Sequence, residues 1–203
     1  MLTTAVDVFG YEQFFPAKIS EDIQLDGYRI IDAYELDSDF KILIGRPEIE
    51  TSENEGLRII VLKDDAISFI GDKQGESYIY RPTFYKESNN VIIICELGTE
   101  YSWGFDAYLF TNSTLNKIGF FNLGAAINKI DHPESAIPLL RIRALKKDIF
   151  FDFPPTLIYE TYDAETIDLI YKPGQKESEI IPLDSINYIY NESEGLVMNK
   201  SNR

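Results

Sequence analysis

The sequence predicts an all-β protein, built mainly as an antiparallel meander of hairpins with little helix. Short runs rich in Tyr, Phe, Ile and Val recur along the chain, and these residues favour pleated, half-buried strands. Polar turn sequences separate the runs about every 8–12 residues, a spacing typical of all-β sandwiches and barrels. We therefore expect the hairpins to form a sandwich, an open sheet or a propeller-like arrangement.

Two hairpins stand out. Residues 28–34 and 40–44 flank a polar stretch with Asp and Ser, and residues 57–62 and 66–70 flank Lys-Asp-Asp. Asp and Ser favour turns because their side chains bond the nearby backbone. Residues 91–95 are continuously apolar, which predicts a strand covered on both faces. The other expected strands are 77–80, 83–85, 105–110, 117–121, 137–145, 157–162, 166–171 and 186–190.

Helical patterns are short. Residues 124–129 have the pattern of one or two helical turns, and residues 12–20 are a weaker case that Pro16 interrupts. We expect one β domain over residues 1–203, with a loop break near residues 131–138. The polar tail, residues 191–203, is expected to be frayed.

The charge of the chain restricts its partners. Thirty-four acidic and 19 basic residues give a net charge of −15. Such a surface repels phosphate backbones and anionic lipids, so we expect neither nucleic acid nor membrane as a partner. A basic protein is the partner that this charge attracts. One cysteine, and no signal-like or membrane-length apolar segment, favour a cytoplasmic location.

The sequence offers little catalytic chemistry. Cys95 and His132 are the only residues of their types, which leaves no Cys-based zinc site and no pair of histidines for a metal. Cys95 ends an apolar run, so we expect a buried structural thiol. Glycine-rich nucleotide loops are absent from the sequence. We therefore predict no catalytic residue, no metal and no cofactor.

The segment 96–106 is the most unusual stretch. It combines acidic and aromatic side chains, which are typical of a protein interface with aromatic anchors and a charged rim. The predicted binding residues are Glu96, Glu100, Tyr101, Trp103 and Asp106. Core packing of the aromatic residues is the competing interpretation.

These observations favour a non-enzymatic, acidic protein-binding module that neutralises a basic partner such as a toxin or a nuclease. The alternative is a carbohydrate-binding or glycoside-hydrolysing β protein. In that case a sugar stacks on Trp103 while nearby carboxylates flank its bond. A structural component without a specific ligand is a third hypothesis.

Overall fold

The computed structural model describes residues 9–74, 77–99, 102–121, 140–152, 158–161, 179–182 and 186–200. Within these ranges the chain forms antiparallel strands and no helix, which confirms the predicted fold class. The strands are β1 (Phe9–Phe14), β2 (Ala17–Lys18), β3 (Tyr28–Glu35), β4 (Phe40–Pro47), β5 (Arg58–Lys63), β6 (Ala66–Ile70), β7 (Ile79–Glu87), β8 (Asn90–Gly98), β9 (Ser102–Thr111), β10 (Thr114–Phe121), β11 (Arg141–Leu145), β12 (Asp148–Asp152), β13 (Ile158–Thr161), β14 (Glu179–Pro182), β15 (Ile186–Asn191) and β16 (Gly195–Lys200).

A five-stranded sheet contains β2 to β6 in chain order, and its tight turns confirm the two hairpins expected from the sequence. Asp37 Oδ1 accepts hydrogen bonds from the backbone N–H groups of Asp39 and Phe40, which fixes the β3–β4 turn. Asp64 and Asp65 have φ values of 49° and 62° in the β5–β6 turn. Consecutive positive φ values are typical of two-residue hairpin loops, and Asp tolerates them.

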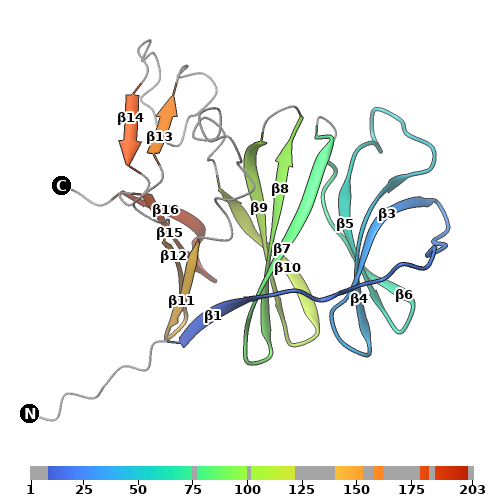
Figure 1. The fold of residues 1–203 in the computed structure, drawn as a ribbon, viewed down its shortest axis with the longest axis horizontal. Helices are drawn as coiled ribbons and strands as arrows, with labels where there is room; N and C mark the ends of the chain where they lie inside the picture. Colours follow the sequence, from blue (N-terminus) through green and yellow to red (C-terminus); the bar gives the residue numbers. More distant parts are fainter. Residues whose placement is uncertain are drawn as a thin grey trace, which may run out of the picture.

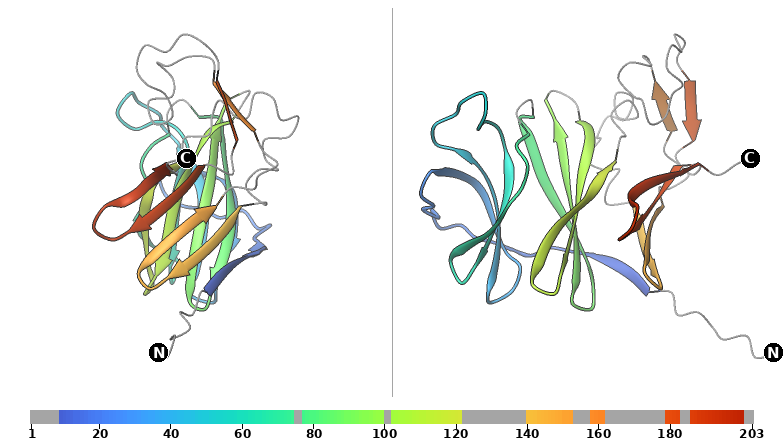
Figure 2. Two further views of the ribbon diagram at one scale, coloured as in Figure 1. Left: turned by 90° about the vertical axis from the view of Figure 1, so that its left-hand side faces the viewer. Right: turned by 180° about the vertical axis from the view of Figure 1, so that it is seen from behind.

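A nine-stranded sheet has the order β10-β9-β8-β7-β1-β11-β12-β15-β16. The N-terminal strand β1 therefore joins strands from distant parts of the chain (Figures 1 and 2). The sheet curls until its edge strands β10 and β16 contact each other. The approach is so close at Gly119 that a Cβ atom added there would lie only 2.4 Å from the Cβ of Leu196. β13 and β14 form a separate two-stranded sheet.

The two larger sheets enclose two main cores. One core lies inside the curl of the nine-stranded sheet and includes Ile92, Ile94 and Phe105. The second lies between β7–β10 and the five-stranded sheet, and it includes Ile93 and Cys95. Alternate residues of β8 enter different cores, so the prediction that residues 91–95 are covered on both faces is confirmed.

Three local predictions need correction. The helical pattern over residues 12–20 is wrong, because this segment forms the end of β1 and β2, with Phe15 and Pro16 between them. Residues 195–200 are not frayed, since they form β16 and pair with β15. The separate strands expected at residues 77–80 and 83–85 are one strand, β7, which contains Pro82 in its interior.

The position of Pro82 has a physical reason. β1 pairs with β7 only at Phe84, Tyr85 and Lys86, so β7 has one neighbour, β8, at Pro82. Proline has no N–H to donate and is therefore tolerated where a strand has an unpaired edge. The expected elements at 124–129 and 166–171, the loop break at 131–138 and His132 lie outside the described residues.

Candidate functional site

Glu96 and Asp106 are both buried, with 5% and 2% of their surface exposed. They do not meet. Cys95 is the register partner of Asp106, whereas Glu96 is opposite Phe105, and paired residues point to the same face of a sheet. Glu96 therefore faces the interior of the nine-stranded sheet, and Asp106 faces the five-stranded sheet. The structure separates Glu96 from Asp106, two of the three carboxylates that the carbohydrate alternative names; the third, Glu100, lies outside the described residues.

A one-residue irregularity produces this separation. The register between β8 and β9 shifts between Leu97 and Gly98. Continuing the Gly98–Ser102 pairing without the shift would place Asp106 opposite Ile94, on the same face as Glu96. A single-residue register change exchanges the two faces of a strand. The shift therefore decides which acid enters which core.

Asp106 belongs to a hydrogen-bonded cluster, which we call the Asp106 cluster: Gln74, Tyr80, Asp106, Tyr108 and Lys117. Asp106 Oδ2 accepts from Gln74 Nε2 at 2.9 Å and from the Tyr80 hydroxyl at 3.2 Å. The Tyr108 hydroxyl lies 2.7 Å from that of Tyr80, and Lys117 Nζ lies 2.9 Å from Asp106 Oδ1. These donors compensate the cost of burying the charge.

The Cys95 thiol and the hydroxyls of Tyr80 and Tyr108, which lie beside Asp106, stay neutral at neutral pH. Burial, and then the negative charge of Asp106, raises the pKa of the Cys95 thiol. Burial is also the main cause that raises the pKa of Tyr80 and Tyr108. Cys95 is fully buried, which confirms the expected buried thiol and gives it no nucleophilic character. The Asp106 cluster is therefore a structural network that ties the connection between β6 and β7, through Gln74, to the nine-stranded sheet.

The other three predicted binding residues are Glu100, Tyr101 and Trp103. Glu100 and Tyr101 lie outside the described residues, and Trp103 is placed in β9 by its backbone alone. Of the five predicted binding residues, the structure describes the side chains of Glu96 and Asp106, which lie on opposite faces of their sheet. Two hollows among the described residues, one of them lined by Glu96, have the features of a binding site.

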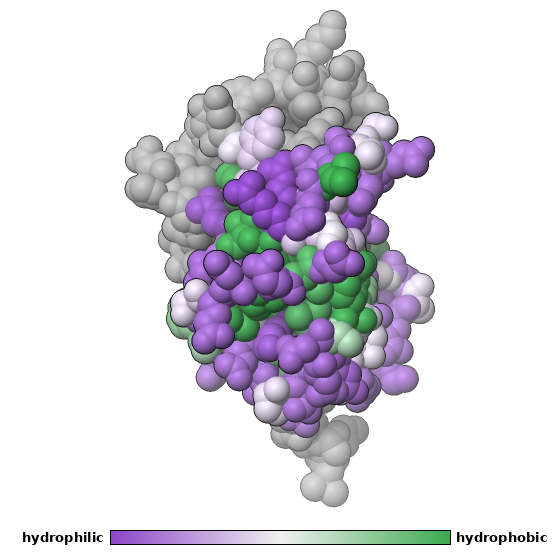
Figure 3. Space-filling view, turned by 90° about the vertical axis from the view of Figure 1, so that its right-hand side faces the viewer, coloured by the Kyte–Doolittle hydropathy of each residue, from purple (hydrophilic) through white to green (hydrophobic). Residues whose placement is uncertain are grey.

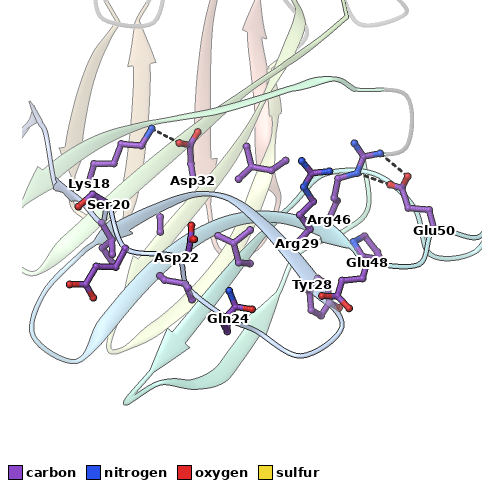
Figure 4. Close-up of a pocket in the computed structure, with 17 residues that line it drawn as sticks. Lys18, Ser20, Asp22, Gln24, Tyr28, Arg29, Asp32, Arg46, Glu48 and Glu50 are labelled. Atoms are coloured by element: carbon purple, nitrogen blue, oxygen red, sulfur yellow. Dashed lines mark hydrogen bonds and ion pairs between the residues drawn. The ribbon is translucent and has the colours of Figure 1, made fainter.

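The larger hollow, which we call the outer groove, has a volume of about 830 Å³ on the outer face of the five-stranded sheet (Figure 4). Residues 19–25 cross this face, and Ile19, Ile23 and Leu25 pack on its small core. The groove runs between this segment and the strands β3 and β4. Its principal lining residues are Ile19, Asp22, Ile23, Arg29, Ile30 and Glu48.

Ion pairs occupy both ends of the outer groove. Lys18 contacts Asp32 at one end, and Arg46 Nη2 lies 2.6 Å from Glu50 at the other (Figure 4). Three further acids, Glu21, Asp22 and Glu48, and one further base, Arg29, line it. The pairs cancel their own charges, so the groove keeps an excess of negative charge.

Apolar side chains extend the outer groove over the neighbouring surface. Ile31, Arg46 and Glu50 line both this groove and a smaller hollow beside Tyr78. Ile49 and Tyr78 are each 81% exposed. Figure 3 shows apolar residues gathered across the middle of this face between hydrophilic residues. An apolar centre with a polar rim is the usual composition of a protein interface.

The second hollow, the junction pocket, lies where the two larger sheets meet and has a volume of about 360 Å³. It opens beside the half of β7 that β1 leaves unpaired. Glu96 lines this pocket, where Arg81 Nε lies 3.1 Å from its Oε2. The pocket is defined by Lys18, Asp32, Tyr34, Arg81, Pro82, Thr83, Ile94, Glu96 and Phe105.

Sequence reasoning found Glu96 but missed its companions. The aromatic stretch from Tyr78 to Tyr85 is interrupted by Arg81, Pro82 and Thr83. This interruption was the feature of the sequence that could have indicated a polar pocket at this strand. No sequence pattern indicated Lys18 and Asp32, because they belong to the five-stranded sheet and reach the pocket only through the packing of the two sheets.

Comparison with protein families, with curated proteins and with solved structures finds no match to this chain. The described residues contain no group of three or more side chains suited to a metal ion. Within the same residues, no helix is long and apolar enough to span a membrane.

Proposed function

We propose that this chain is a non-enzymatic protein-binding module that captures a basic partner on the outer groove. The observation that carries the proposal is the hollow of about 830 Å³, with its acid-rich lining and the exposed apolar side chains beside it. A toxin or nuclease with a basic surface is the kind of partner that the overall charge of −15 suits.

Two physical terms act together at this surface. Exposed Ile31, Ile49 and Tyr78 offer apolar area whose burial stabilises a complex. The acids Glu21, Asp22 and Glu48 speed the encounter with a positive surface and disfavour negatively charged competitors. The negative charge thereby favours association with a basic partner, and the burial of apolar side chains stabilises the complex once it has formed.

The carbohydrate alternative receives no support from the pairing of Glu96 with Asp106, and Glu100 lies outside the described residues. Glycoside hydrolysis needs two carboxyl groups on either side of one bond, and Glu96 and Asp106 lie on opposite faces of their sheet. Sugar binding through Trp103 stays a hypothesis.

The test is an affinity capture from the native lysate with three immobilised proteins. These are the wild type, the groove variant Asp22→Lys/Glu48→Lys and the control Glu192→Lys/Glu194→Lys. The control has the same change in charge but lies in the β15–β16 turn, far from the five-stranded sheet (Figure 1). We expect a basic protein on the wild type and the control, lost from the groove variant and weakened by salt.

The purified partner is then titrated against all three proteins. Equal affinity for the groove variant and the control would show that the outer groove is not the binding surface. A captured partner that is acidic, or whose binding is independent of salt, would contradict the charge argument.

A further inference from the structure

The junction pocket differs in composition from the outer groove, although Lys18 and Asp32 line both hollows. Its floor is formed by Ile94 and Phe105, each 1% exposed, together with Glu96. Its mouth is formed by longer side chains from both sheets, Arg81 and Lys18. The pocket exists because β1 leaves β7 after Phe14 and crosses towards β2, which exposes one edge of β7.

In the junction pocket the positively charged side chains are more exposed than the negatively charged ones. The side chains of Arg81 and Lys18 are 56% and 63% exposed, so the positive charges lie at the mouth. The side chains of Asp32 and Glu96 are 24% and 7% exposed, so the negative charges lie deeper. A ligand that enters meets cations first and a carboxylate at the floor.

We propose that the junction pocket binds a small zwitterion, specifically an α-amino acid. Its ammonium group points inward to Glu96, and its carboxylate stays at the mouth beside Arg81 and Lys18. Arg81 and Glu96 form an ion pair, and a ligand with both charges can insert between them, whereas a simple amine offers no partner to Arg81 and a simple carboxylate offers none to Glu96. The interaction at the floor is strong because burial lowers the local dielectric constant.

Size and surface chemistry agree with this ligand class. A volume of about 360 Å³ is near the lower end of the range of roughly 300–1,000 Å³ for small-molecule sites. Pro82, Ile94, Phe105 and the Tyr34 ring provide apolar wall for a ligand side chain. Burial, and then the charge of Asp32, raises the pKa of Tyr34, so its hydroxyl remains a donor at neutral pH.

The experiment is a calorimetric titration of the full chain with each of the twenty α-amino acids up to 10 mM. For every amino acid that binds, its amide and its N-acetyl form are titrated as matched probes. The amide lacks the carboxylate, and the N-acetyl form lacks the ammonium group. We expect at least one amino acid to bind, and both derivatives to bind at least tenfold more weakly.

Three variants locate the site. Glu96→Gln and Arg81→Gln are each expected to weaken binding at least tenfold. Arg143→Gln is the control, because it breaks a half-exposed ion pair with Asp152, and neither residue lines the junction pocket or the outer groove. Far-ultraviolet circular dichroism checks the fold, and Arg81→Gln keeps the test decisive if Glu96→Gln does not fold, since Arg81 is half exposed.

No binding by any of the twenty amino acids would overturn the inference. Equal binding of the amide would replace it with a cation site, and unchanged binding by Arg81→Gln and folded Glu96→Gln would place the ligand elsewhere. None of these results affects capture of a basic partner, which is measured with variants of the outer groove.

Discussion

Glu96 and Asp106 lie on the neighbouring strands β8 and β9 and are buried to a similar degree, but their surroundings differ. The Asp106 carboxylate lies within hydrogen-bonding distance of donors on Gln74, Tyr80, Tyr108 and Lys117. The two tyrosines belong to the same nine-stranded sheet as Asp106. Glu96 lines a pocket and contacts an arginine that is half exposed to solvent. Burial alone therefore does not distinguish the acid of the Asp106 cluster from Glu96, for which we propose a binding role; the space beside the carboxylate does.

The largest effect is expected for Asp106→Ala. The substitution leaves Lys117, Tyr80 and Gln74 without their common acceptor inside the molecule. Leaving a buried donor such as the Tyr80 hydroxyl unsatisfied costs about 1–3 kcal/mol of the free energy of unfolding, whereas Lys117 is 30% exposed and keeps Asp72 nearby, so loss of its ion pair adds less. Urea denaturation followed by circular dichroism measures the loss. A change below about 1 kcal/mol would contradict the structural role of the Asp106 cluster.

Alkaline pH provides the second test of the same cluster. Burial raises the pKa of Tyr108 above its ordinary value of 10.0. Above pH 10 the unfolded chain therefore releases a proton that the folded chain keeps, so stability falls as pH rises. Tyr108→Phe should cost about 1 kcal/mol at neutral pH but flatten the decline above pH 10. Denaturation at pH 8 and pH 10.5 checks this, with Tyr28→Phe, on a half-buried tyrosine, as the comparison.

Glu96→Gln sharpens the comparison because its effect should be smaller. The amide keeps the volume of the side chain, and Arg81, once unpaired, remains hydrated at the mouth of the pocket. We expect a loss of about 1 kcal/mol or less in the free energy of unfolding. A loss as large as that of Asp106→Ala would show that Glu96 is also a structural acid.

The smallest effect is expected for Arg81→Gln. Ion pairs with a solvent-exposed partner contribute about 0–1 kcal/mol, so the midpoint of urea denaturation should hardly move. A stability loss above about 2 kcal/mol would show that Arg81 is needed to keep Glu96 buried.

The sequence by itself determined the local structure. Alternating apolar residues and Asp-rich turns fixed the β3–β4 and β5–β6 hairpins, because strand period and turn chemistry depend on neighbours in the chain. The apolar run 91–95 determined that this strand is buried on both sides, with Cys95 inside. The abundance of acids was also sufficient to propose a basic partner.

The tertiary structure decided which residues meet. The position of β1 between β7 and β11 is a pairing between distant segments, and β1 opens the junction pocket where it leaves β7. The shift between Leu97 and Gly98 places Glu96 and Asp106 on opposite faces. The sequence pattern did not give these results, because strand order depends on contacts across the whole chain and a one-residue change of register exchanges the two faces of a strand.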